Sequence, residues 1–93
     1  MTVRFEWDDD KAEANYAKHG IPFELAVRVF DDPFRFEIED DRFDYGEERV
    51  ITLGLIDGRV YVVVYTPRDD RCRIISARKA NARESRRYHD LQT

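Results

Sequence analysis

Six consecutive apolar residues, Val60–Tyr65, constrain the fold of this chain more than any other segment. A strand without polar alternation must be covered on both faces, so the predicted strand Arg59–Thr66 is expected at the centre of a sheet. Asp57-Gly58, a strong hairpin signal, connects it to a preceding strand over Arg49–Ile56. A turn at Arg68-Asp69-Asp70 leads into a third strand, Cys72–Lys79. The second half of the chain therefore predicts an antiparallel meander.

Two further strands are predicted in the first half. Apolar residues alternate with charged residues in Val3–Trp7 and again in Phe34–Ile38, the period of a strand with one buried face. A polar, mostly acidic loop over Asp40–Gly46 follows the second of them. We expect the aromatic rings of Phe5, Trp7, Phe23, Phe30, Phe34 and Phe36 to belong to the core.

Three helices complete the pattern. Asp8-Asp9-Asp10 can cap a helix that ends with Lys18-His19 and Gly20. A metal site is the alternative for the three acids, but adjacent residues in a capping turn diverge in direction. A second helix opens at Pro22 and presents Phe23, Ala26, Val27 and Phe30 to the core. Ala80–Asp90 predicts the closing helix.

These elements predict an α+β fold in the order β-α-α-β-β-β-β-α, as one domain over residues 1–93. Two helices are expected on one face of an antiparallel meander sheet, and the last helix near its edge or end. The hydrophobic fraction of 42% argues against disorder, although 39% of the residues are charged.

Charge is distributed unevenly along the chain. Residues 1–48 contain 6 basic and 15 acidic side chains, whereas residues 49–93 contain 10 basic and 5 acidic ones. The segment Arg71–Tyr88, a strand followed directly by a helix, has seven Arg or Lys residues and one acid, Glu84. This local excess in an acidic protein indicates a partner that carries phosphate, or an acidic protein.

Other classes are disfavoured. No apolar run approaches the ~20 residues of a membrane span. The first residues lack the apolar core of a signal peptide, so we expect a cytoplasmic protein. A single cysteine, Cys72, cannot form an internal disulfide or a cysteine metal cluster, and a small buried strand residue is its simplest interpretation. No cofactor motif is present, and we expect no cofactor and no metal.

A succession of short motifs extends over nearly the whole chain: Phe5-Glu6-Trp7-Asp8, Lys11, Asn15, Lys18-His19-Gly20-Ile21, Phe23, Ala26, Val29–Pro33, Glu48-Arg49, Gly54, Tyr65-Thr66, Ile75–Ala80, Glu84 and Tyr88. In these residues the chain resembles the BrnT family. The segments are individually short, but they occur in the expected order around the same strands and helices.

The resemblance implies a toxin of a bacterial type II toxin–antitoxin pair with a RelE-like microbial ribonuclease fold. It also implies a metal-independent endoribonuclease that cleaves RNA and inhibits translation. A BrnA-like antitoxin, a ribbon-helix-helix DNA-binding protein, would neutralise it, and operator DNA would be reached only through that antitoxin. A non-catalytic module that binds nucleic acid or the antitoxin is the alternative.

Metal-free RNA cleavage needs a base for the ribose 2′-OH, cations for the developing phosphorane charge and a proton donor. Arg49, Arg68 and Arg78 lie at strand ends or turns, where we expect three guanidiniums to converge at one edge of the sheet and bind a phosphate. For acid and base, His19, Glu48, Glu84, Lys18 and Lys79 remain open. The resemblance favours Lys18, His19, Arg49, Arg78 and Glu84 as catalytic residues, and Arg68 is added from the strand geometry.

Each candidate has a structural alternative. His19 can complement the dipole at the end of the first helix. Glu84 can pair with Arg87 or Tyr88 within its helix. Lys79, Arg83, Arg86, Arg87 and Tyr88 are expected to bind RNA or the antitoxin, yet the arginines can equally form a solvated helix face. Tyr88 can stack on a base or pack its ring on the sheet.

Overall fold

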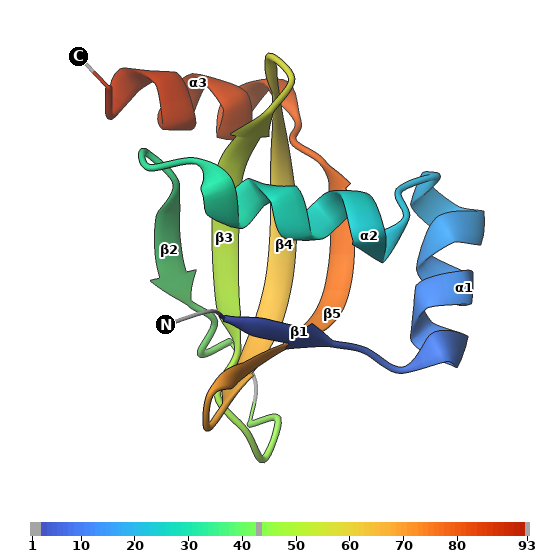
Figure 1. Ribbon diagram of the computed structural model, residues 1–93. Helices are drawn as coiled ribbons and strands as arrows, with labels where there is room; N and C mark the ends of the chain where they lie inside the picture. The colour runs from blue at the N-terminus through green and yellow to red at the C-terminus, as the bar shows by residue number, and fades with distance from the viewer. Residues whose placement is uncertain (1–2, 43, 93) are drawn as a thin grey trace.

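The computed structural model describes residues 3–42 and 44–92. Within them the elements are β1 (Arg4–Glu6), α1 (Asp9–His19), α2 (Phe23–Ala26), the 3₁₀ helix η1 (Val27–Asp31), β2 (Phe36–Glu39), β3 (Val50–Ile56), β4 (Arg59–Arg68), β5 (Arg71–Lys79) and α3 (Ala82–Asp90). Residues 1, 2, 43 and 93 of the predicted 1–93 domain lie outside the described residues. Residue 43 belongs to the predicted Asp40–Gly46 loop. The predicted α+β class and order of elements are confirmed (Figure 1).

The sheet is mixed rather than wholly antiparallel. Its strand order is β1-β5-β4-β3-β2, and β2 to β5 form the predicted antiparallel meander. β1 departs from the prediction because it pairs in parallel with β5, with Phe5 opposite Cys72. The prediction of an antiparallel sheet is therefore wrong at this edge. β4 lies in the middle, as its continuous apolar run requires.

Two turns of the meander use the left-handed backbone conformation. Asp57 and Gly58 both have positive φ, 49° and 84°, as expected for a type I′ hairpin turn whose twist matches that of the strands. Asp69, at φ 54°, occupies the turn between β4 and β5. These turns hold β3, β4 and β5 in register.

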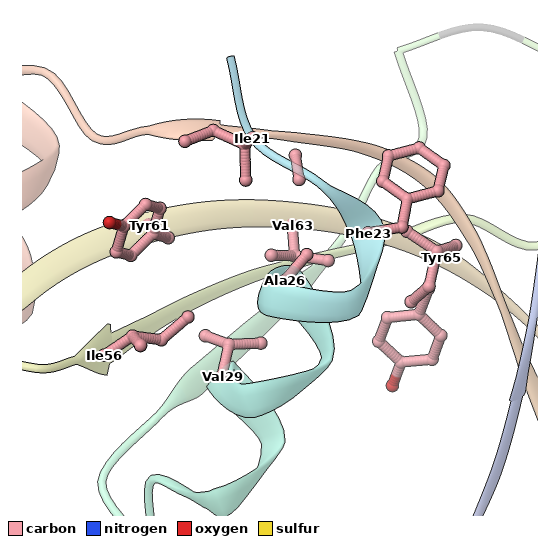
Figure 2. Packing of buried hydrophobic residues seen from close by; sticks show 10 residues of the cluster. Ile21, Phe23, Ala26, Val29, Ile56, Tyr61, Val63 and Tyr65 are labelled. Carbon is pink, nitrogen blue, oxygen red and sulfur yellow. The ribbon is translucent and has the colours of Figure 1, made fainter. Parts of the chain in front are cut away.

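The main core lies between the sheet and α2 with η1. Figure 2 shows Phe23, Ala26 and Val29 facing the side chains of β3 and β4. Of the predicted stripe, Phe23 and Ala26 are fully buried, and Val27 and Phe30 are half-buried and pack against the same cluster. The prediction omitted Val29, which is fully buried. The helix tightens to 3₁₀ after Ala26, and residues three apart are eclipsed in a 3₁₀ helix, which directs every third side chain inward. Gly54 of β3 permits this approach, since a Cβ there would lie 2.2 Å from Val29 Cγ2.

α1 lies beside β5 rather than across the sheet face (Figure 1). The predicted capping is confirmed: the Asp8 carboxylate accepts from the Asp10 amide at 2.8 Å, and Gly20 ends the helix in the left-handed conformation. The buried amide of Asn15 donates to the Ala77 carbonyl at 2.9 Å and accepts from the Ala77 amide at 3.1 Å. It thus satisfies the edge of β5 beyond the end of β1, as a neighbouring strand would.

α3 covers the opposite sheet face at one end. Tyr88 packs with Leu53, Val60 and Val62 in a second apolar cluster. Its hydroxyl donates to the buried Asp32 carboxylate, which also accepts from the amides of Phe34 and Leu55 at 2.8 Å each. Phe34 itself is 65% exposed, so its predicted place in the core is wrong.

Asp32 is the carboxylate that joins α3 to the rest of the fold. Burial disfavours its charge, but the hydrogen bonds from Tyr88 and the two amides outweigh burial and lower its pKa. Burial and the Asp32 contact in turn raise the pKa of Tyr88 to about 12.

We expect Tyr88→Phe to lower the free energy of unfolding by about 1–3 kcal/mol at pH 7, since it removes a donor from a buried carboxylate. A carboxyl group whose pKa is lower in the folded than in the unfolded state stabilises the fold at pH values above its unfolded pKa. This contribution is lost as the pH falls through the folded pKa. Urea unfolding from pH 7 to pH 3 should therefore show the difference between variant and wild type shrinking below about pH 4. An equal difference at every pH would contradict this role of Asp32.

Candidate active site on the open sheet face

The sheet face on the α3 side carries a row of arginines. Side chains alternate along a strand, and residues directly opposite one another share a face. Val62, on the α3 side, is opposite Arg78, and Thr66 and Arg68 are opposite Arg73 and Arg71. Arg49 precedes β3 with the same orientation. α3 covers only the end near Tyr88, so the other end of this surface, with Ile51 and Val64 half-buried, is open.

At the open end, Glu47 lies between two of the predicted catalytic arginines. Its Oε2 is 3.8 Å from Arg49 Nε and its Oε1 is 3.6 Å from Arg68 Nη2. The Thr66 hydroxyl donates to Oε2 at 3.2 Å. The Arg49 guanidinium stacks 3.9 Å from the centroid of the Tyr45 ring. We name Tyr45, Glu47, Arg49, Thr66 and Arg68 the Glu47 cluster.

The Glu47 cluster is partly shielded from water. The side chains of Glu47 and Arg49 are 29% and 24% exposed, whereas Arg68 is 51% exposed. Arg49 Nε is buried and donates no hydrogen bond to any residue in the described part of the chain. A carboxylate fixed beside two cations and open to solvent on one side can accept a proton while the guanidiniums bind an anion.

A second carboxylate organises the adjacent arginines. Glu6 of β1 contacts Arg71 Nη1 at 3.0 Å and Arg73 Nη1 at 2.8 Å. The hydrogen bond from Arg73 lowers the pKa of Glu6, with the charges of Arg71, Arg73 and Arg68 in support and burial in opposition. Arg68 therefore lies near both Glu6 and Glu47.

Arg78 does not join Arg49 and Arg68. It is opposite Val62, six residues along β4 from Arg68, or roughly 20 Å at the rise of a strand. The predicted convergence of three guanidiniums at one edge is therefore wrong for Arg78. The three side chains lie on the same face of the sheet. Arg78 is distant from the other two because it lies near the α3 end of β5.

Arg78 forms a two-pronged ion pair with Glu84, with Nη1–Oε1 and Nη2–Oε2 distances of 2.8 Å. Glu84 also accepts from the Asn81 amide at 2.9 Å, which completes a capping box at the start of α3. The pair lowers the pKa of Glu84 and raises that of Arg78. Glu84 thus pairs with Arg78 and not with Arg87 or Tyr88, the partners expected within its helix.

Lys18 and His19 lie at the end of α1, on the far side of β5 from the Glu47 cluster. His19 follows Asn15 by one helical turn and is half-buried, and Lys18 is exposed. Neither side chain forms a hydrogen bond or ion pair with another residue that the structure describes. Their position in the last turn is the one predicted for cations that complement the helix dipole. Their catalytic roles remain predictions.

The other predicted binding residues are dispersed. Arg83, Arg86 and Lys79 are exposed, and the Arg87 guanidinium lies 5.4 Å from the centroid of the Phe36 ring. Tyr88 is only 3% exposed. Its predicted packing on the sheet is confirmed, and its ring is not available for stacking on a base. Cys72 is half-buried in β5.

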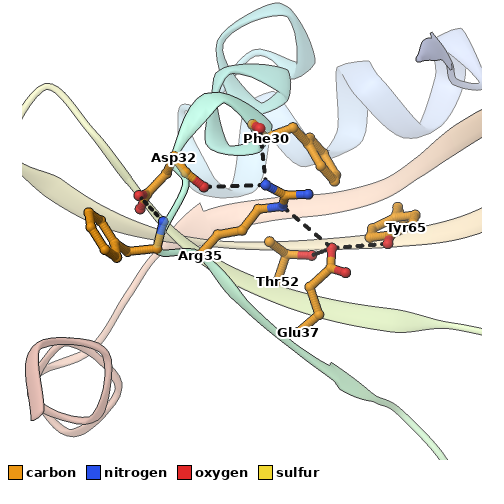
Figure 3. Close-up of polar contacts among 7 residues, drawn as sticks. Phe30, Asp32, Arg35, Glu37, Thr52 and Tyr65 are labelled. Carbon is orange, nitrogen blue, oxygen red and sulfur yellow. Dashed lines mark hydrogen bonds and ion pairs between the residues drawn. The ribbon is translucent and has the colours of Figure 1, made fainter. Parts of the chain in front are cut away.

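The opposite sheet face has its own polar network beside η1. Figure 3 shows Arg35 between the carbonyls of Phe30 and Asp32 and the Glu37 carboxylate. Glu37 also accepts from the hydroxyls of Thr52 and Tyr65, at 3.1 and 3.0 Å. This network anchors β2 below η1.

Residues 3–42 and 44–92 form neither a metal centre nor a membrane-spanning helix. They contain no group of three or more His, Cys, Asp or Glu side chains placed to hold a metal ion. No helix in these ranges has the length and apolar character needed to cross a membrane. The predicted capping role of Asp8 accounts for the acid run that raised the metal alternative.

Comparison with known proteins identifies the family. Residues 7–84 match the family model described as the ribonuclease toxin BrnT of type II toxin–antitoxin systems. The chain belongs to this family. No curated protein matches it. The BrnT match includes Arg49, Arg68, Arg78 and Glu84 and ends at the first turn of α3.

Sequence reasoning missed Glu47, Thr66, Tyr45 and the arginines paired with Glu6. Glu47 stands in an acidic loop, and its one sequence signal is its place two residues before Arg49. Its neighbour Glu48 was considered as a candidate acid or base, but Glu48 is exposed and makes no ion pair with another described residue. Glu6 is 67 residues from Arg73, and only the parallel pairing of β1 brings them together.

We expect Glu84→Gln to lower the free energy of unfolding by about 1 kcal/mol at pH 7. The change removes one charged partner and weakens the capping box, but Arg78 is 40% exposed, so solvent screens part of the ion pair. The loss should diminish as pH falls through the lowered pKa of Glu84. Thermal unfolding of both proteins at pH 7 and pH 3 measures it, and a greater loss at pH 3 would contradict the assignment.

Proposed function

We propose that this BrnT toxin is a metal-independent endoribonuclease whose reaction takes place at the Glu47 cluster. The observation that carries the proposal is the Glu47 carboxylate between Arg49 and Arg68 on an open sheet face. In the proposed reaction, Glu47 takes the proton of the ribose 2′-OH as the 2′-oxygen attacks phosphorus. The bond from phosphorus to the 5′-oxygen breaks, the departing 5′-oxygen takes a proton from water to become a 5′-hydroxyl, and a 2′,3′-cyclic phosphate remains.

The arginines supply the electrostatic part of the mechanism. Arg68 and Arg49 can each turn free guanidinium donors to a phosphate, because Glu47 engages one nitrogen of each. Stacking on Tyr45 holds the plane of the Arg49 guanidinium. Preorganised cations stabilise the charge that develops on the phosphorane without reorganisation during the reaction.

RNA is proposed to lie along the face that continues from the Glu47 cluster toward Arg78. This direction follows the open side of β4 and β5, whereas the acidic residues 1–48 would repel a polyanion elsewhere. Cleavage of cellular RNA would inhibit translation, and a BrnA-like antitoxin would neutralise the toxin and carry it to operator DNA. Arg78 and Glu84 remain candidates for RNA contacts farther along this face. Lys18 and His19 remain candidate catalytic residues, although they lie apart from the Glu47 cluster.

We expect Glu47→Gln to reduce the rate of RNA cleavage by ~10²–10⁴-fold, the usual contribution of a positioned general base. The assay uses purified, antitoxin-free toxin in EDTA and identifies 2′,3′-cyclic phosphate ends. Glu48→Gln is the matched control, since it removes the same charge from the adjacent exposed residue. Equal activities of the two variants would contradict the role of Glu47, and absence of cleavage by wild type on all RNAs would favour a non-catalytic binding module.

The double variant Arg78→Ala/Lys79→Ala tests the path of the RNA. We expect it to weaken RNA binding and to relieve growth arrest at equal expression, because it removes two cations near α3. Binding should also become less dependent on salt concentration. Undiminished growth arrest by the double variant would show that RNA does not follow this face.

A further inference from the structure

β2 forms an edge of the sheet, and its outward main-chain groups pair with no other residue that the structure describes. It pairs with β3 on one side and ends the strand order on the other. The Asp40 amide donates to the Arg49 carbonyl at 2.7 Å. In an antiparallel ladder the bonded positions alternate, so Phe36 and Ile38 also face β3. The amides and carbonyls of Glu37 and Glu39 therefore point outward.

The two flanks of this edge differ in chemistry. On the α3 side, Ile38 is 36% exposed, Phe34 65% and Leu91 59%. The Gln92 side chain, which follows Leu91, donates to the Phe34 carbonyl at 3.4 Å, so the end of α3 lies beside Phe34. On the other flank Glu39 projects and Asp41 follows, whereas the Glu37 carboxylate is held by Arg35, Thr52 and Tyr65. Glu39 and Asp41 make no ion pair with another residue that the structure describes.

We propose that the β2 edge binds an extended segment of the antitoxin, which adds a sixth strand to the sheet. Main-chain bonds to Glu37 and Glu39 would fix the segment, as in other cases of strand addition. Its alternate residues would be Lys or Arg, beside Glu39 and Asp41, and apolar residues, beside Ile38 and Phe34. The inference rests on the proposed function only in assuming a protein antitoxin.

Charge selects this occupant over the alternatives. A second copy of the chain paired through the same edge would bring Glu39 and Asp41 of both copies onto one flank, and like charges on adjacent strands destabilise a sheet. RNA would meet the same acidic flank. The opposite edge strand, β1, is shorter, with three residues. A basic, alternating protein segment is the partner that matches both flanks of β2.

The location also provides a means of neutralisation. Asp40 continues the ladder of β2 to Arg49, a member of the Glu47 cluster. A strand added to β2 would therefore reach the end of the sheet beside Arg49, and its apolar side chains would lie on the same side as the open sheet face. Binding of the antitoxin at this edge would restrict access of RNA to Arg49 without direct contact with Glu47.

The test is Glu39→Pro in the full chain, with binding of the antitoxin encoded beside it measured by calorimetry. Proline removes the outward amide of residue 39 and costs no bond to β3, a change that edge strands tolerate. We expect affinity to fall by ~10-fold or more, as for a loss of at least 1.4 kcal/mol. Glu39→Gln, which keeps the amide, should retain most of the affinity at physiological salt. Unchanged affinity of a folded Glu39→Pro variant would overturn the proposal.

Two further measurements separate the remaining outcomes. Hydrogen exchange of the wild-type chain should show protection of the Glu37 and Glu39 amides when the antitoxin is added, and protection confined to other segments would overturn the proposal even where Glu39→Pro fails to fold. Sedimentation should show the free chain to be monomeric, since a dimer abolished by Glu39→Pro would assign the edge to a second copy. RNA cleavage by antitoxin-free Glu39→Pro should equal that of wild type. If wild-type protein does not cleave RNA but Glu39→Pro still weakens antitoxin binding, the ribonuclease proposal is refuted and the proposal for the β2 edge stands.

Discussion

The requirement to cover β4 on both faces determines the rest of the structure. α2 with η1 covers one face, and α3 covers part of the other. α3 has nine residues and β4 has ten, which correspond to about 14 Å of helix and about 33 Å of strand. One helix cannot cover such a strand. The remainder of this face, which α3 leaves open, carries Arg49, Arg68 and the buried Thr66 where a core would continue with apolar residues.

Carboxylates organise the arginines along this face. Glu47, Glu6 and Glu84 each contact arginine side chains and hold them in fixed orientations. Without these anions, neighbouring guanidiniums would repel one another in a partly dehydrated surface. The arrangement reconciles a net charge of −4 with a phosphate-binding site, because the cations are concentrated on one face and most of the unpaired acids lie elsewhere.

The order of elements and the central strand were predictable, because hydrophobic period and turn residues are local signals. The parallel β1–β5 pair was not, since nothing in three residues identifies a partner near the other end of the chain. The ion pair of Glu6 with Arg73 was unpredictable for the same reason, since it depends on the pairing of β1 with β5. Val29, which the predicted stripe omitted, is fully buried because the helix tightens to 3₁₀, while Val27 packs at the margin of the same core. Arg49 and Arg68 could be placed from the meander, whereas Glu47 depended on the path of an irregular loop.

The central claim, that RNA reacts at the Glu47 cluster, is tested most directly by mapping a bound, uncleavable RNA. NMR titration with a single-stranded RNA whose 2′-hydroxyls are blocked as methyl ethers identifies the amides and Arg Nε–H groups that it perturbs. The account predicts the largest changes at Arg49, Thr66 and Arg68, with little change at Thr52 and Tyr65 on the opposite face. Perturbations confined to α1 or to the outer side of α3 would contradict it.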